Sequence, residues 1–162
     1  MFQQAKKRPM PLRPFFLLVI LLICSYRASA QDSEAESVKS VIRQLFEGMK
    51  RGDSAMVKAV FEEGAMLHTA VKTKTGEIKL AKEALQGFLT AVGRPHTDVW
   101  DERITFGQVL VDGPMASVWT PYQFFIGDKF SHCGVNSFQL YKSEKGWKIT
   151  YLIDTRRKDN CL

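Results

Sequence analysis

The chain has 162 residues, of which 45% are hydrophobic and 25% are charged. This length suits one ordinary domain, and the composition excludes a chain that is mostly disordered. The formal net charge of +6 is at first sight typical of a nucleic-acid-binding protein. However, the first 30 residues hold five basic side chains and no acidic one, which leaves 18 of the 23 basic side chains and all 17 acidic ones in residues 31–162. That part is nearly neutral, so we expect no nucleic-acid partner.

The first 30 residues have the pattern of an export signal. A basic start is followed by an uncharged apolar run over residues 15–24 and then by Ala28, Ser29 and Ala30, a small-residue pattern that signal peptidase accepts. The basic residues of the start are Lys6, Lys7, Arg8 and Arg13. The apolar run is shorter than the roughly 20 residues that a membrane-spanning helix needs.

We therefore predict a signal peptide over residues 1–30, with cleavage near Ala30 and Gln31. The mature part, residues 31–162, is then one domain that is periplasmic or secreted and has no stable membrane anchor. A retained membrane anchor and a lipid-modified Cys24 are the two alternatives.

Two cysteines remain in the mature part, Cys133 and Cys161. Cysteines can pair in an oxidising compartment, and a bridge requires the end of the chain to fold back. The sequence leaves open whether these two pair.

Apolar spacing predicts three helices in the front half of the mature domain. The first runs from a cap at Ser37 to Gly52, because apolar residues recur there at helical spacing. Its apolar stripe is Val38, Val41, Ile42, Leu45, Phe46 and Met49. Asp53 is expected to cap a short second helix that closes at Gly64, and a third helix is expected over residues 80–92.

Most of the remaining residues are typical of strands. One strand is expected over residues 65–71, between the second and third helices. Four more, over residues 99–111, 115–126, 130–142 and 147–155, are separated by turn residues such as Asp-Gly and Gly-Asp. Helices followed by an antiparallel meander predict an α+β fold.

The last hairpin has a register that separates apolar from mixed side chains. A loop of four residues, 143–146, places Leu140 opposite Ile149 and Phe138 opposite Tyr151, and the same count pairs Asn136 with Ile153. In this register Tyr151 points to the inner face of the sheet, and Asp154 points to the outer face.

The preceding hairpin allows two registers. A loop over residues 127–129 pairs Phe124 with His132 and Thr120 with Asn136, and it sets Tyr122 opposite Gly134. A two-residue loop brings Gln123 opposite His132 instead. The first register is preferred because it keeps the apolar residues of both strands on one face.

Polar groups on this otherwise apolar inner face are the candidate site. Buried polar groups without partners cost about 1–3 kcal/mol each, so a cluster of them indicates internal hydrogen bonds or a wet cavity. The candidate ligand contacts are Thr120, Tyr122, Phe124, His132, Asn136 and Tyr151. His132 is the best candidate for a catalytic acid or base, since a histidine titrates near neutral pH.

The end of the chain carries a family resemblance. Residues 131–157, with Gly-Trp-Lys-Ile at residues 146–149, and the opening helix that leads into Gly52 and Asp53 resemble nuclear transport factor 2-like domains. The nearest branch is the exported bacterial one described as lumazine-binding or polyketide-cyclase-like. The resemblance implies an α+β cone with N-terminal helices packed in the hollow of a curved, mainly antiparallel sheet. It also implies a pocket at the open end and a homodimer.

The resemblance implies two kinds of function. Ketosteroid isomerase and scytalone dehydratase of this superfamily use Asp, His and Tyr side chains inside the cone, but Asn136 stands where an aromatic residue is often found and no inward aspartate is expected here. The main hypothesis is therefore an exported domain that binds a small apolar or aromatic ligand. The alternative is a hydro-lyase or isomerase that uses His132 and Tyr122. A third hypothesis is a structural domain with a closed cone.

We expect no cofactor and no metal. The three histidines, His68, His96 and His132, are scattered and lack the local spacing of metal ligands.

Overall fold

The computed structural model describes residues 13–73 and 75–161, with side chains from residue 32 onward. The chain divides into two compact units, Met1–Ser33 and Glu34–Leu162, and the second holds the whole sheet. Part of the predicted signal peptide, residues 1–12, lies outside the described residues.

The first helix, α1, spans Arg13–Arg51 and ends where Gly52 adopts a φ of 66°. The prediction that Ser37 caps this helix is wrong, because Ser37 lies inside it. The residues before it, Asp-Ser-Glu-Ala-Glu, contain no helix breaker, so nothing forces the helix to begin at Ser37. The predicted apolar stripe is confirmed, with Val38 and Ile42 fully buried.

The second helix, α2, spans Ser54–Val60, and the predicted cap is confirmed because the Asp53 carboxylate accepts a hydrogen bond from the Met56 N–H at 2.9 Å. The helix ends earlier than the predicted Gly64. Strand β1, Phe61–Lys72, begins directly after it, because Phe61 already pairs with Ile149 of the last strand.

The predicted third helix over residues 80–92 is half wrong. Residues Ile78–Ala84 form strand β2, which pairs antiparallel with β1 at the edge of the sheet, and only Leu85–Gly93 form helix α3. Every residue of β2 is exposed, so its apolar residues do not form the buried side of a helix. The α3 helix buries Leu89 and Val92.

The predicted strand over residues 99–111 is interrupted. It consists of β3, Trp100–Ile104, and β4, Gln108–Asp112, which both pair with the next strand, β5. Ile104 lies opposite Tyr122 and Gln108 opposite Trp119, so three residues of this segment face only two of β5. The additional residue makes a β-bulge, and it lies beside a proline of β5 that has no N–H to donate.

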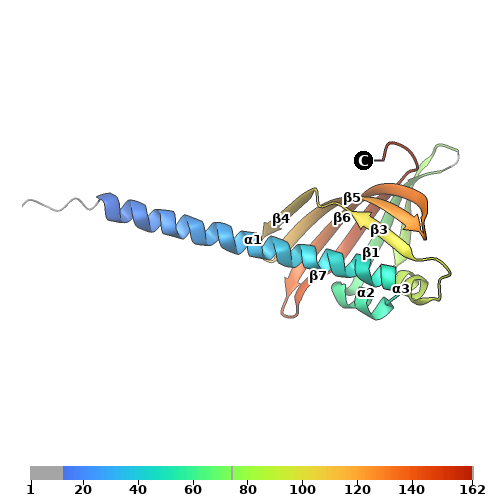
Figure 1. Ribbon diagram of the computed structural model, residues 1–162, viewed down its shortest axis with the longest axis horizontal. Helices are drawn as coiled ribbons and strands as arrows, with labels where there is room; N and C mark the ends of the chain where they lie inside the picture. Colours follow the sequence, from blue (N-terminus) through green and yellow to red (C-terminus); the bar gives the residue numbers. More distant parts are fainter. Residues whose placement is uncertain (1–12, 74, 162) are drawn as a thin grey trace, which may run out of the picture. The chain divides into compact units, whose positions relative to one another are not determined.

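Three long strands complete the sheet: β5, Met115–Ile126, β6, Lys129–Ser143, and β7, Gly146–Arg156. The order is β2-β1-β7-β6-β5-β3, with β4 also on β5 (Figure 1). All neighbours are antiparallel except β1 and β7, which are parallel. The α+β prediction is confirmed: helices pack against an open, curved and mostly antiparallel sheet.

The preferred register of the β5–β6 hairpin is confirmed. Phe124 pairs with His132 and Thr120 with Asn136. The turn is nevertheless a two-residue one, Gly127 and Asp128, and a bulge between Phe124 and Phe125 supplies the additional residue that restores the predicted pairing.

The predicted register of the β6–β7 hairpin is right near its turn and wrong beyond it. Leu140 pairs with Ile149, but a bulge at Thr150 then sets Phe138 opposite Leu152 and Asn136 opposite Asp154. The Thr150 hydroxyl donates to the Gln139 carbonyl at 3.1 Å within this bulge. The side chains beyond it therefore exchange faces, because strand side chains alternate.

This correction changes which residues reach the interior. Tyr151 and Ile153 lie on the outer face, whereas Leu152 and Asp154 lie on the inner face. Asp154 is 8% exposed. The expectation of no inward aspartate was therefore wrong.

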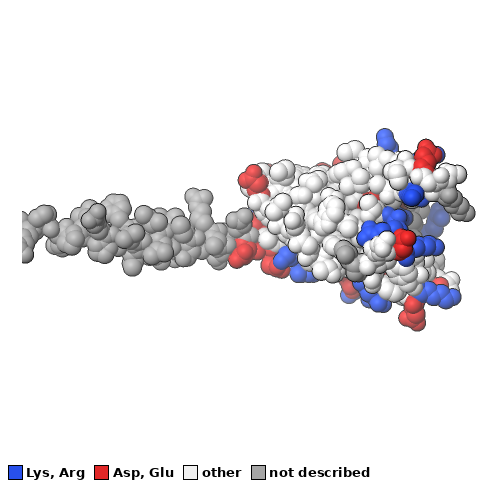
Figure 2. Space-filling view, turned by 90° about the horizontal axis from the view of Figure 1, so that it is seen from above, with Lys and Arg blue, Asp and Glu red and all other residues white. Residues whose placement is uncertain are grey.

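The core lies between the inner face of the sheet and α1. Phe138 and Leu140 of β6 and Ile149 of β7 are almost completely buried together with Ile42 and Leu45 of α1. Charged side chains are unevenly spread over the face shown in Figure 2: its middle is mostly white, charged groups lie at both ends of the coloured part and along its lower edge, and those at the right-hand end lie beside a hollow.

Candidate functional site

A cavity of about 80 Å³ lies between the helices and the inner face of the sheet. Its apolar wall comes from α1, α3, β1 and β7 and consists of Leu45, Phe46, Met49, Leu67, Phe88 and Leu152. Its polar side chains are those of Thr69, Glu83, Glu102, Asn136, Asp154 and Arg156. His68 also borders the cavity, but its ring lies on the outer face of the sheet. Glu83 is exposed, so the cavity reaches solvent on the side of β2.

The first polar group of the cavity is centred on Glu102 of β3. Its carboxylate accepts a hydrogen bond from the Asn136 side-chain N–H at 2.8 Å, and the same amide lies 3.4 Å from the Thr120 hydroxyl. Asn136 and Thr120 are buried. Burial raises the pKa of Glu102 from 4.5 to about 7, although the hydrogen bond from Asn136 opposes this rise. Glu102 therefore exchanges a proton near neutral pH.

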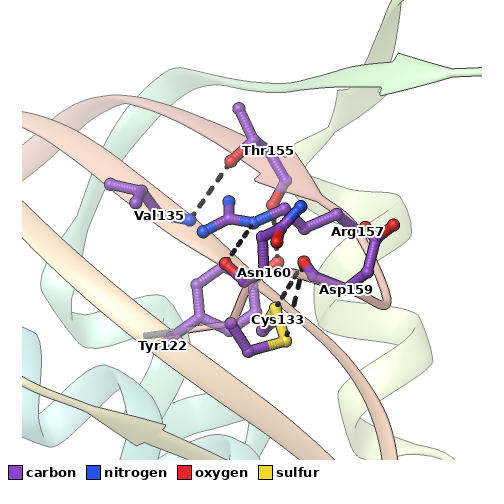
Figure 3. The surroundings of a disulfide bond; sticks show 8 residues. Tyr122, Cys133, Val135, Thr155, Arg157, Asp159 and Asn160 are labelled. Carbon is purple, nitrogen blue, oxygen red and sulfur yellow. Dashed lines mark hydrogen bonds between the residues drawn. A yellow bond between two sulfur atoms is a disulfide. The ribbon is translucent and has the colours of Figure 1, made fainter.

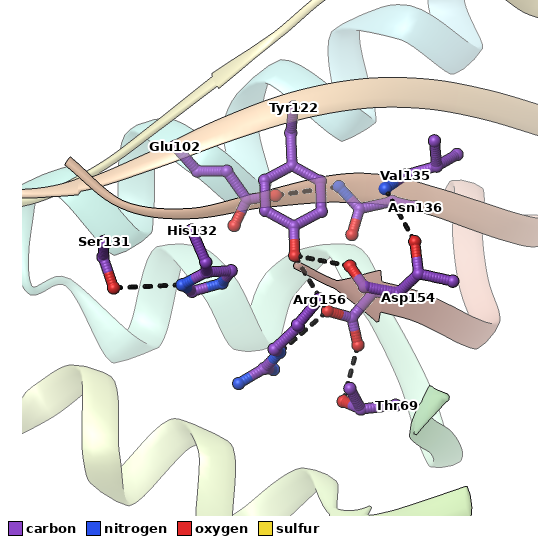
Figure 4. A network of polar contacts seen from close by, with 10 residues as sticks. Thr69, Glu102, Tyr122, Ser131, His132, Val135, Asn136, Asp154 and Arg156 are labelled. Carbon is purple, nitrogen blue, oxygen red and sulfur yellow. Dashed lines mark hydrogen bonds and ion pairs between the residues drawn. The ribbon is translucent and has the colours of Figure 1, made fainter. Parts of the chain in front are cut away.

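The second polar group is centred on Asp154 of β7 (Figure 4). Its carboxylate accepts hydrogen bonds from the Thr69 hydroxyl at 2.5 Å, from the Arg156 guanidinium at 2.9 Å and from the Tyr122 hydroxyl at 3.1 Å. Burial, followed by the charges of Asp154 and Glu102, raises the pKa of Tyr122, so its hydroxyl keeps its proton. The Asp154 charge is thus fully solvated by protein groups.

A distorted stretch of β7 supports this second group. The Thr155 carbonyl accepts a hydrogen bond from the Tyr122 hydroxyl at 2.9 Å, and the Thr155 hydroxyl accepts one from the Val135 N–H at 3.2 Å. A Cβ atom at Gly134 would lie only 1.8 Å from that carbonyl oxygen. Gly134 is therefore required by the close approach of two backbones.

A disulfide bond between Cys133 and Cys161 fixes the chain next to this stretch (Figure 3). Cys133 also forms two backbone hydrogen bonds with Arg157, at 2.8 and 2.9 Å. The bridge decides the pairing that the sequence left open. It holds the residues after β7 against β6, beside Tyr122 and Thr155.

His132 lies on the inner face, but it is not among the residues that line the cavity. Its ring is 5.0 Å from the Phe124 ring and 5.7 Å from the Tyr122 ring, and its Nδ1 is 3.0 Å from the Ser131 hydroxyl. Burial and then the charge of Arg156 lower the pKa of His132, so the neutral form predominates at neutral pH.

The structure separates the residues that the sequence grouped together. Asn136 lines the cavity, while Thr120 and Tyr122 lie one hydrogen bond behind its surface. Phe124 and His132 lie further along the same face. The predicted ligand contact Tyr151 lies on the outer face, where its hydroxyl is 3.0 Å from His68 Nδ1.

Five polar side chains of the lining were missed: Thr69, Glu83, Glu102, Asp154 and Arg156. Glu102 had a usable signal, because it alternates with Trp100 and Ile104 in a predicted strand and so shares their inner face. No sequence signal indicated Asp154 and Arg156, because the bulge at Thr150 decides to which face of the sheet they point.

No group of three or more His, Cys, Asp or Glu side chains in the described part of the chain is placed to hold a metal ion. Among the described helices, none has a stretch both long and apolar enough to cross a membrane.

Comparison with solved structures identifies the fold. A nuclear transport factor 2-like protein of unknown function from Shewanella baltica matches with a TM-score of 0.60 and 18% identity, over 78% of this chain and 96% of the other. A nuclear transport factor 2-like protein with a cystatin-like fold from Novosphingobium aromaticivorans matches with a TM-score of 0.63 and 14% identity, over 86% and 90%. The chain has the nuclear transport factor 2-like fold. The fold that the resemblance implied is thereby confirmed.

A third similar structure carries a suggested activity. It is a nuclear transport factor 2-like protein from Streptomyces avermitilis that is proposed to be a dehydratase, with a TM-score of 0.55 and 15% identity over 78% of this chain and 98% of the other. At such identities the likeness concerns the fold alone. No protein-family model matches the chain, and no curated protein matches it.

Proposed function

We propose that the domain binds a small molecule in the cavity between the helices and the inner face of the sheet. The observation that carries this proposal is the two-sided lining: the apolar side chains of α1 and α3 face a carboxyl and an amide, Glu102 and Asn136. Binding sites are commonly apolar with a few placed polar groups that orient the ligand. An apolar body against Phe46 and Phe88 and one polar group at Glu102 match this lining.

The size of the cavity limits the ligand. Sites for drug-sized ligands have roughly 300–1,000 Å³, whereas this cavity has about 80 Å³. A cavity of roughly 150 Å³ suffices for benzene. The volume therefore favours a ligand of a few heavy atoms, or the end group of a larger one, over a whole fused-ring molecule such as a lumazine.

Three probes of nearly equal size test the proposal: isobutanol, isobutylamine and isobutyrate. We expect at least one to cause saturable shifts of the methyl resonances of Leu45, Leu67 and Leu152 in an NMR titration. Leu152→Phe, which fills the cavity, should abolish these shifts, whereas Leu110→Phe on the exposed surface should not. The absence of saturable shifts with all three probes would contradict the proposal.

A second candidate function is acid–base catalysis, as in a hydro-lyase or isomerase that uses His132 and Tyr122. Glu102 favours it, because a carboxyl with a pKa of about 7 suits proton transfer at neutral pH, and one similar structure is proposed to be a dehydratase. It is the weaker candidate because the Tyr122 hydroxyl is engaged by Asp154 and Thr155 and because His132 does not line the cavity.

Loss of water from 4-hydroxybutan-2-one, followed by the ultraviolet absorbance of the enone, tests this candidate. Catalysis predicts turnover above the buffer rate that His132→Ala or Glu102→Gln removes while the far-UV circular dichroism is retained. A rate equal to that of the buffer would count against dehydration of this β-hydroxy ketone.

We further propose that the domain is exported and acts as a homodimer. The disulfide between Cys133 and Cys161 supports an oxidising compartment, and the signal-like pattern of residues 1–30 supports cleavage near Ala30. N-terminal sequencing of the protein from a periplasmic extract should begin at Gln31, and light scattering should give twice the mass of the mature chain. A start at Met1 or a monomer mass would contradict the respective proposal.

A further inference from the structure

Two of the three carboxyl groups of the cavity, Glu102 and Asp154, have unlike surroundings (Figure 4). Asp154 has the guanidinium of Arg156 and two hydroxyl donors around it. Glu102 has the Asn136 amide, and it forms no salt bridge with any Lys, Arg or His of the described residues. Unlike Asp154, the Glu102 carboxylate thus has no salt-bridge partner, and the Arg156 charge acts on it only through space.

An ionised carboxylate away from water is costly unless a cation or several donors face it. Without such a partner the carboxyl instead takes up a proton, and the pKa of about 7 for Glu102 agrees with this. A ligand that supplies the missing cation would turn this cost into an attraction. The cavity therefore provides a specific place for positive charge.

The other lining groups agree with a cation rather than an anion. Arg156 is held by Asp154, with its Nε 2.9 Å from the carboxylate, and Glu83 adds a further acidic side chain at the solvent side. An anion would therefore face Glu83, Glu102 and Asp154. Phe46 and Phe88 line the apolar side, and the faces of aromatic rings attract cations.

We propose that the ligand carries a cationic group, such as a primary ammonium on a short apolar body, and that Glu102 is the residue that binds this group. The inference rests on the proposed function, since it names the ligand class of the same cavity. Asn136 positions the Glu102 carboxylate through its hydrogen bond, and the apolar wall receives the body of the ligand.

The proposal makes binding dependent on pH. A cation binds the ionised form of Glu102, so binding releases a proton below about pH 7, and the affinity rises with pH through that range. The other titratable or charged groups on the elements around Glu102 are Glu83, Tyr122, His132, Asp154 and Arg156, together with Lys50 of α1, which forms a salt bridge with the neighbouring Asp101. The α1 and α3 helices contribute only apolar residues to the lining.

The experiment is an NMR titration of the folded, disulfide-bonded protein with isobutylamine, isobutanol and isobutyrate at pH 6 and pH 8. At pH 8 we expect isobutylamine to bind at least tenfold more tightly than isobutanol, and isobutyrate to bind most weakly. At pH 6 the affinity for isobutylamine should fall roughly tenfold, because a group with a pKa near 7 is mostly protonated there, whereas the affinity for isobutanol should not fall.

Glu102→Gln is the decisive variant, because glutamine can still accept the hydrogen bond from Asn136. It should remove both the preference for the amine and its pH dependence while isobutanol binding persists. Glu144→Gln, the control that removes an exposed carboxylate outside the cavity, should leave isobutylamine binding unchanged.

Each failure has its own meaning. Equal binding of isobutylamine and isobutanol by the unaltered protein, or an amine preference that persists in Glu102→Gln, would overturn the cation proposal and leave small-molecule binding standing. Tighter binding of isobutyrate would do the same. If none of the three probes bound, both this inference and the proposed function would be overturned. The pH dependence of the unaltered protein keeps the test valid even if the variant folds poorly.

Discussion

The two ends of the inner face of the sheet are built from the same strands in opposite ways. Towards the β6–β7 turn, Phe138 and Leu140 pack in an apolar core with almost no exposed surface. Further along the same strands, Thr120, Asn136 and Asp154 are equally buried but polar. Every buried side-chain nitrogen or oxygen of the described residues has a hydrogen-bond partner. The polar end is thus a hydrogen-bond network in which every buried group has a partner. Burying these polar groups costs stability, and the neighbouring apolar core offsets that cost.

The largest expected effect lies at the apolar end. Phe138→Ala should lower the free energy of unfolding by about 3–5 kcal/mol, because a fully buried ring is replaced by a cavity. Phe130→Ala, at a side chain that is 44% exposed, should cost less than about 1 kcal/mol. Urea unfolding followed by circular dichroism measures both. A similar cost for the two variants would contradict the assignment of the core.

The next effect concerns the bridge beside the polar end. Cys133 and Cys161 are separated by 28 residues, and releasing a loop of that length removes roughly 3–4 kcal/mol of stability in the chain-entropy model. Cys161→Ser should therefore unfold at lower urea than the oxidised protein. The reduced unaltered protein is the matched control and should behave like the variant. Equal stability of the oxidised protein and the variant would show that the bridge does not form.

The pH dependence of stability sharpens the comparison directly. Glu102 has an ordinary pKa of 4.5 and a folded-state pKa of about 7, so between these values the folded state binds the additional proton. Stability should therefore fall as the pH rises from about 4.5 to 7, by at most about 3.5 kcal/mol at about 1.4 kcal/mol per pKa unit. Glu102→Gln should remove this fall. Parallel stability profiles of the variant and the unaltered protein would mean that Glu102 titrates normally.

A smaller expected effect tests the backbone support of the polar end. Gly134→Ala should cost at least about 2 kcal/mol, since the new Cβ would overlap the Thr155 carbonyl that Tyr122 contacts. Gly87→Ala is the control in α3, where the nearest atom to a new Cβ is 3.7 Å away and alanine favours the helix. Thermal unfolding should show a loss for the first and none for the second. A harmless Gly134→Ala would mean that the two backbones are farther apart.

The sequence predicted the apolar end better than the polar end, for a physical reason. The stripe from Val38 to Met49 and the β5–β6 pairing follow from side-chain periodicity, which burial enforces. The β2 strand was missed because all its residues are exposed, so its sequence has no alternation of buried and exposed residues.

The candidate site was predicted only in part, because one bulge decides it. Asn136 and Tyr122 were found from alternation along strands whose register was right. Because of the bulge at Thr150, Leu152 rather than Tyr151 points to the inner face, and Asp154 also points inward. A single inserted residue leaves no periodic signal in the sequence. Predicting Glu102 as a site residue required the pairing of β3 with β5. Side-chain alternation within β3 does not establish that pairing.

The central claim is that Glu102 is a partly buried carboxyl at the edge of a cavity, held by the Asn136 amide and without a salt-bridge partner. A carbon-13 NMR titration of its carboxyl carbon tests this most directly, with Asp101, whose pKa the hydrogen bond from Arg103 lowers, as the internal comparison. The account predicts an inflection near pH 7 for Glu102, and a downward shift of it when isobutylamine is added. An inflection near the ordinary value of 4.5 that isobutylamine does not change would contradict the account.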